Sequence, residues 1–106
     1  MLLTLLACGM EASEFPPAAA EAVCTRYEAC LAPEELERLG YDPHATCVKT
    51  WTGPFEDQLK DGDECATFDA DDAQTCLDEL DAWSCADVTG GDFPSSCETK
   101  YLCPRR

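Results

Sequence analysis

The sequence predicts an all-α fold, a small disulfide-stapled bundle of about four short helices. Apolar residues recur at three- and four-residue spacing along most of the chain, as on the buried face of an amphipathic helix. No long segment alternates apolar and polar residues in the way that a strand does. The chain also has nine cysteines in 106 residues, a frequency typical of disulfide scaffolds.

The first predicted helix covers about residues 18–31. Residues 8–17 are expected to form a tether before it, because Pro16-Pro17 is a stiff, extended pair that cannot continue a helix backwards. The apolar stripe of this helix consists of Ala20, Val23, Cys24, Tyr27, Cys30 and Leu31.

Two further helices are expected in the middle of the chain. Pro33-Glu34-Glu35 opens a short one, with acidic residues near its positive end, and Gly40 ends it. Asp42-Pro43 is a cap followed by a first-turn proline, so another helix begins there. Gly53-Pro54 breaks or kinks this helix, and Asp61-Gly62-Asp63 ends it.

The clearest helical pattern runs from Phe68 to Trp83. Asp69 is its N-cap, and Asp72 is placed to reach back in the manner of a capping box. After Cys85 the chain is expected to loosen, before a short helix or turn between Cys97 and Cys103. The helical domain therefore covers residues 18–103, and residues 104–106 form a tail.

The cysteines are predicted to form disulfides rather than a metal site. No two of them are closer than six positions, and His44 is the single histidine, so neither thiolate clusters nor mixed zinc sites fit. Such a cysteine content also indicates an oxidising compartment. The predicted disulfide cysteines are Cys24, Cys30, Cys47, Cys65, Cys76, Cys85, Cys97 and Cys103.

The spacing restricts how these cysteines pair. Cys24 and Cys30 lie about 9 Å apart along a helix axis, which exceeds the distance of about 7 Å that a disulfide tolerates. We therefore expect them to bind different neighbours. An antiparallel pair of helices would bring Cys30 next to Cys47, and this is the one pairing predicted.

The amino-terminal residues suggest a lipid anchor. An uncharged apolar run ends in Leu5-Leu6-Ala7-Cys8, which resembles the lipobox of bacterial lipoprotein signal peptides. The resemblance implies cleavage before Cys8, diacylglycerol on its thiol and acylation of its new amino group. Residues 1–7 lack a basic n-region, so we interpret them as a truncated signal peptide. They are also far shorter than the roughly 20 residues that span a bilayer.

Cysteine parity favours lipid on Cys8. With Cys8 acylated, eight cysteines remain, and an even set can close completely. The alternative, in which Cys8 is an ordinary core cysteine, leaves one thiol unpaired. Gly9, rather than aspartate, follows Cys8, and in lipoproteins this resembles the pattern for sorting to the outer membrane.

The charge excludes several classes of partner. Twenty-two acidic and seven basic residues give a formal net charge of −15. Phosphate backbones and anionic lipid headgroups both repel such a surface, so we expect no nucleic acid and no basic membrane patch. The acidity is interpreted as a solvated exterior, with a surface that attracts cations or a basic partner as the alternative.

No catalytic, metal or cofactor site is predicted. His44 falls in a predicted first helical turn and is expected to be exposed or to act as a cap. The acidic runs 61–64 and 69–72 do not match the spacing of an EF-hand, so a turn and a helix cap account for them. Trp51 and Trp83 are expected in the core, with a ligand groove between helices as the alternative.

The segment from Phe68 to Leu80, followed by Ser84-Cys85-Ala86, resembles the short cysteine-rich lipoproteins of myxobacteria and their relatives. The order and spacing of the other cysteines from residue 20 to residue 103 are similar as well. The resemblance implies a lipid-anchored helical domain of mostly unassigned function. Plant nonspecific lipid-transfer proteins are rejected, because this chain has no adjacent cysteine pair and no Cys-x-Cys.

We therefore expect a non-catalytic, lipid-anchored protein of the bacterial cell envelope, with a binding or structural role. Its expected contacts are the membrane, through the anchor on Cys8, and an unidentified protein. The expected address is the outer membrane, or otherwise the periplasm or the medium. The alternatives are a secreted disulfide-rich effector or inhibitor without an anchor, and an enzyme of unknown type, which would need a cleft with converging polar groups.

Overall fold

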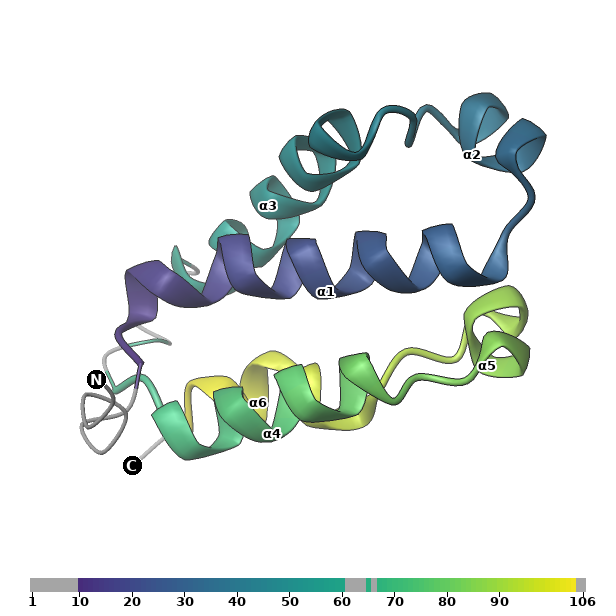
Figure 1. The fold of residues 1–106 in the computed structure, drawn as a ribbon. Coiled ribbons are helices and arrows are strands. Elements are labelled where there is room, and N and C mark those ends of the chain that lie inside the picture. Colours follow the sequence, from purple (N-terminus) through teal and green to yellow (C-terminus); the bar gives the residue numbers. More distant parts are fainter. Residues whose placement is uncertain (1–9, 61–64, 66, 105–106) are drawn as a thin grey trace, which may run out of the picture.

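The computed structural model describes residues 10–60, 65 and 67–104, and these residues confirm the all-α prediction. They contain six α-helices, two short 3-10 helices and no strand (Figure 1). The elements in chain order are η2 (Ala12–Glu14), α1 (Phe15–Cys30), α2 (Pro33–Leu39), α3 (His44–Lys60), α4 (Ala70–Asp81), α5 (Cys85–Gly90), η4 (Ser95–Cys97) and α6 (Thr99–Leu102).

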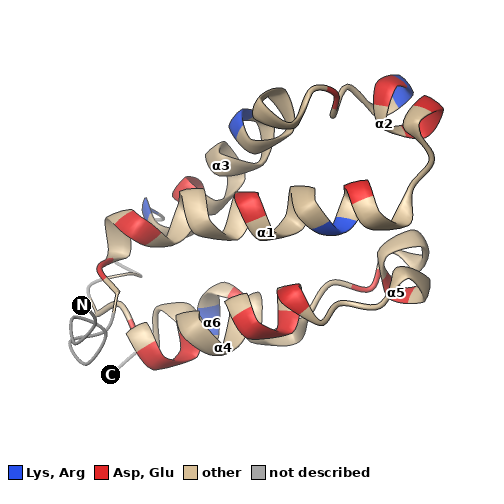
Figure 2. Cartoon of the chain, in the orientation of Figure 1, with Lys and Arg blue, Asp and Glu red and all other residues tan. Residues whose placement is uncertain are grey.

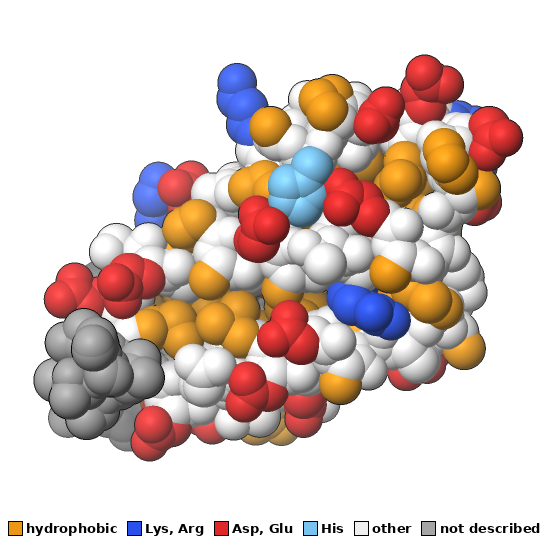
Figure 3. All heavy atoms as spheres, viewed as in Figure 1, with side chains coloured by type: hydrophobic (Ala, Val, Ile, Leu, Met, Phe, Trp, Pro, Cys, Tyr) orange, Lys and Arg blue, Asp and Glu red, His pale blue; other side chains and the backbone are white. Residues whose placement is uncertain are grey.

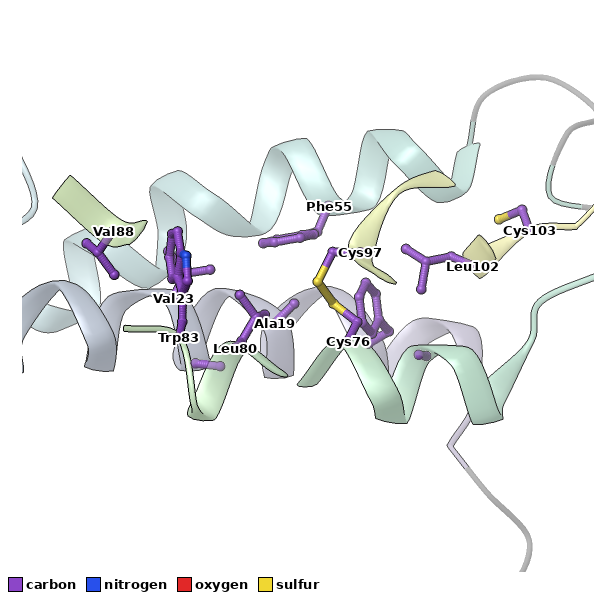
Figure 4. Packing of buried hydrophobic residues seen from close by; sticks show 13 residues of the cluster. Ala19, Val23, Phe55, Cys76, Leu80, Trp83, Val88, Cys97, Leu102 and Cys103 are labelled. Atoms are coloured by element: carbon purple, nitrogen blue, oxygen red, sulfur yellow. A yellow bond between two sulfur atoms is a disulfide. The ribbon is translucent and has the colours of Figure 1, made fainter. Parts of the chain in front are cut away.

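Helix α1 is the centre of the bundle. It lies between α3 on one side and the layer of α4 and α6 on the other, and α5 packs near its carboxyl end (Figure 1). Ala19 and Val23 pack in the main core, whereas Cys24 bonds to α3. Helix α1 is buried on two sides, and its alanine residues let both α3 and α4 approach it closely. The core members are Phe15, Ala19, Ala22, Val23, Phe55, Ala73, Cys76, Leu80, Trp83, Val88, Cys97, Leu102 and Cys103 (Figure 4).

The predicted tether 8–17 is wrong for residues 15–17, which form the first turn of α1. Proline is tolerated there because the first amide groups of a helix have no intrahelical acceptor. Phe15 is fully buried, and its ring meets Phe55 edge-on at 5.8 Å and Phe68 at 6.2 Å, measured between centroids. The folded domain therefore begins before residue 18.

A break or a kink was predicted at Gly53-Pro54, and the break is wrong, because α3 is continuous from His44 to Lys60. An internal proline costs about 3 kcal/mol. Contacts with α1 on both sides of Pro54 offset this cost. Cys47 is disulfide-bonded to α1, and Phe55 is buried against Phe15. The predicted end at 61–63 lies outside the described residues, and α3 ends at Lys60.

Helix α4 begins at the predicted cap, since Asp69 Oδ1 accepts a hydrogen bond of 2.9 Å from the amide of Asp72. The reciprocal half of the capping box is replaced by a tertiary contact. The amide of Asp69 donates to the carbonyl of Leu102 at 2.9 Å, so Asp72 has no free donor to reach back to. The cap of α4 thereby also binds the carboxyl-terminal helix.

The expected loosening after Cys85 is wrong, because residues 85–90 form α5. Ser84 Oγ caps this helix by accepting from the amide of Asp87 at 3.1 Å, and Gly91 ends it with a φ of 80°. Gly40 ends α2 in the same left-handed conformation, as predicted. The predicted short helix between Cys97 and Cys103 is α6.

All eight cysteines after Cys8 form disulfides: Cys24–Cys47, Cys30–Cys85, Cys65–Cys103 and Cys76–Cys97. Cys24 and Cys30 do bind different neighbours, but the predicted pairing of Cys30 with Cys47 is wrong. Helix α2 takes up chain between α1 and α3, so α3 begins alongside the middle of α1 rather than at its end (Figure 1). Cys47 therefore reaches Cys24, and Cys30 bonds to Cys85 of α5.

The four disulfides indicate an oxidising, extracytoplasmic compartment. None of the helices that the structure describes is both long enough and apolar enough to span a membrane.

Candidate functional site

The predicted lipidation residue, Cys8, lies outside the described residues. The chain enters the described part at Met10, beside the amino-terminal end of α1. Helices α2 and α5 lie at the opposite end of α1 (Figure 1). Since α1 has 16 residues and rises 1.5 Å per residue, these helices lie roughly 24 Å further along its axis.

A solvent-open cleft lies between α3 and the loop that follows α5. Trp51, Phe55 and Gln58 share one face of α3, because they are four and three residues apart. Gly91 turns the chain back after α5, which brings Phe93 over this face. The resulting cleft has a volume of about 270 Å³ and is lined by Trp51, Pro54, Phe55, Gln58 and Phe93.

Phe93 is the exposed aromatic residue of this cleft. Its ring is parallel to that of Trp51, with centroids 6.3 Å apart, and meets Trp83 edge-on at 5.1 Å. It also lies 6.2 Å from Phe55. Despite these contacts, 39% of Phe93 remains exposed. Among the described residues, Leu39 and Tyr101 are the other large hydrophobic residues that are exposed.

A second cleft lies on the other side of Phe93, and its walls are acidic. It has a volume of about 350 Å³, and the acidic residues Glu79, Asp87 and Asp92 line it together with Trp83. Ser96 Oγ donates to Glu79 at 2.6 Å. Within the part of the chain that the structure describes, none of the three carboxylates forms an ion pair with a basic side chain.

Two hydrogen bonds hold Trp83 beside the acidic cleft. Its indole Nε1 donates to the carbonyl of Asp92 at 2.7 Å, and its own carbonyl accepts from Arg26 Nε at 2.8 Å. Trp83 is 5% exposed, so it is a core residue as expected. Trp51 is partly buried, packs against the core cluster and also lines the cleft.

Two residues that line the apolar cleft each have a buried polar atom without a hydrogen-bond partner in the described structure, Trp51 Nε1 and Gln58 Oε1. Gln58 Nε2 donates to the carbonyl of Cys97 at 3.2 Å, which fixes the amide group. The rings of Tyr27, Tyr41, Phe55 and Phe93 surround the Trp51 indole. Burial, and then the neighbouring Tyr41, raise the pKa of Tyr27.

His44 links α3 to α1 through two carboxylates. Its Nδ1 lies 2.7 Å from Glu28 Oε2, and its Nε2 lies 2.8 Å from Glu21 Oε2. A neutral imidazole has one N–H, so both bonds form only with the protonated ring. Figure 3 shows the histidine at the surface between two acidic side chains. The expectation of an exposed histidine holds, but its role is to pair helices rather than to cap one.

The His44 contacts predict a pH-dependent stability. The hydrogen bonds to Glu28 and then to Glu21 raise the pKa of His44 above 6.5. The stabilisation is therefore fully present below pH 6.5 and is lost as the pH rises through the pKa of the folded state. Because the side chain is 36% exposed, we expect a loss of at most about 1 kcal/mol as the pH rises from below 6.5 through the raised pKa of the folded state. Urea unfolding measures this loss, and His44→Gln should remove it; an equal loss in that variant would contradict the assignment.

Among residues 10–60, 65 and 67–104, no group of histidine, cysteine or acidic side chains is arranged to hold a metal ion. The acidic run 61–64 lies outside the described residues, and the run 69–72 caps α4. Acidic residues are spread over all the longer helices rather than gathered in one place (Figure 2). Sequence patterns therefore gave no indication of which carboxylates face the cleft.

Comparison with protein-family models, with curated proteins and with solved structures finds no match for this chain.

Proposed function

We propose that this chain is a non-catalytic, lipid-anchored protein of the bacterial cell envelope whose helical domain binds a partner. The observation that carries the proposal is the disulfide pattern. Four disulfides use all eight cysteines that follow Cys8, so this chain contains no further cysteine with which Cys8 could pair. Acylation is then the chemistry that its lipobox-like surroundings favour.

The chemistry of the described residues supports a role without catalysis. Both nitrogens of the single histidine, His44, are hydrogen-bonded to carboxylates, so neither is available as a general base. The cysteines from Cys24 to Cys103 are oxidised and offer no thiolate. The open clefts beside Phe93 suit contact with a partner.

The proposed address is the outer membrane, with the domain held by lipid on Cys8 and Gly9 as the sorting residue. The amino-terminal end of α1 would then face the membrane, and α2 and α5 would point away from it (Figure 1). Several acyl chains on one residue anchor firmly, since each buried methylene contributes about 0.8 kcal/mol.

Replacing Cys8 with serine is expected to release the protein from the membrane. Expression of the gene in a bacterial host should yield wild-type protein in the detergent phase of a phase separation and with an acyl mass on Cys8. Cys8→Ser should move to the aqueous phase, whereas the adjacent change Gly9→Ser should keep the acyl mass. Wild-type protein found wholly in the aqueous phase without acyl mass would instead favour the secreted effector or inhibitor.

A further inference from the structure

The two clefts beside Phe93 share one aromatic ring but differ in chemistry. One is apolar and the other carries three carboxylates. We propose that together they bind a segment of a partner protein that places an apolar side chain next to a lysine or arginine. This inference rests on the proposed binding role and is independent of the lipid anchor.

The apolar cleft has room for one large side chain. A cavity of about 150 Å³ is enough to hold benzene, so about 270 Å³ accommodates a phenylalanine or leucine side chain. Such a side chain would cover Phe93, whose exposed fraction of 39% leaves apolar surface in water. Two of its lining residues are held in place, because Phe55 is buried in the core and Gln58 is hydrogen-bonded to the backbone of Cys97.

The acidic cleft selects a cation. Glu79, Asp87 and Asp92 form no ion pairs within residues 10–60, 65 and 67–104, so their charges are available to a ligand. Phe93, which is 39% exposed, lines the same cleft, and an aromatic ring also attracts a cation. The net charge of −15 draws basic partners from a distance and repels acidic ones.

The shape and the charge together favour a segment of another protein. Small-molecule sites enclose most of their ligand, whereas both clefts here are open to solvent. A protein segment can fill the two clefts with neighbouring side chains and cover Phe93 between them. A second copy of this chain is disfavoured, since it brings 22 acidic and only seven basic residues.

The test is a titration of the full chain with a short capped peptide in which lysine follows phenylalanine. We expect saturable shifts of the indole N–H signals of Trp51 and Trp83 in NMR spectra, and weaker binding as salt is added. Phe93→Ala, and separately the double variant Asp87→Asn with Asp92→Asn, should each weaken the peptide about fivefold. Circular dichroism should show that these surface variants keep their helices.

Matched controls make the titration decisive. Leu39→Ala removes another exposed apolar side chain, and Glu34→Gln with Glu37→Gln removes the same charge from α2; both should leave the affinity unchanged. The absence of saturable binding, equal losses in the controls, or equal affinity for a peptide with glutamate in place of lysine would overturn the proposal. Equal affinity for phenethylamine would assign the clefts to small amines and overturn it as well. Acylation of Cys8 has no bearing on these outcomes, so the two proposals fail separately.

Discussion

Replacing Cys76 and Cys97 together with alanine is expected to lower the free energy of unfolding by about 5 kcal/mol. Loop-closure entropy accounts for about 3.3 kcal/mol at their sequence separation of 21. The sulfur atoms contribute the rest, because the two residues are 0% and 1% exposed and their truncation leaves a cavity between α4 and η4 (Figure 4). A loss of this size approaches the whole stability of a small domain.

The matched control is the double alanine variant of Cys30 and Cys85, whose bond closes a longer loop. Entropy alone gives about 4.2 kcal/mol for its separation of 55, more than for the buried bond. Cys85 is exposed, however, so its removal leaves little cavity. Urea unfolding followed by circular dichroism compares the variants. If the Cys30–Cys85 variant is the less stable of the two, loop entropy dominates and the assigned core role of Cys76–Cys97 is wrong.

Local signals in the sequence were sufficient for the fold class and for most helix ends. Asp69, Gly40 and Pro33 act through contacts within one or two turns, so a short window of sequence contains the relevant information. The Ser84 cap is equally local, since Asp87 lies three residues later. The nearby residues Gly90-Gly91 and Pro94 predicted a loop instead of α5, because several helix-breaking residues outweigh a single cap in such a short helix.

Features that depend on distant parts of the chain were not predictable from local patterns. The pairing of Cys30 depends on how much room α2 needs between α1 and α3. The clefts are likewise non-local, because Phe93 is exposed and reaches Trp51 across 42 positions of sequence. An aromatic residue beside Asp92 in a glycine-rich loop was the available signal. It shows neither which helix the loop covers nor which carboxylates face the same cleft.

Phe15→Ala is expected to cost about 3–5 kcal/mol of stability, although the sequence pattern placed this residue in a tether. Its ring is fully buried and contacts Phe55 of α3 and Phe68, which lies just before α4. Alanine would leave a cavity where α1, α3 and the start of α4 meet. The short stretch η2 and the first turn of α1 would lose the contact that holds them to the domain.

Phe93→Ala is the matched control for this prediction, because it makes the same chemical change at a residue that is 39% exposed. We expect it to cost about 1 kcal/mol, since Phe93 lies outside the buried core cluster and its truncation opens to solvent instead of leaving an enclosed cavity. Urea unfolding at one pH value, followed by tryptophan fluorescence, gives both differences. A true tether at residue 15 would make the two variants equally stable, and the amino-terminal boundary of the domain would then lie after Pro17.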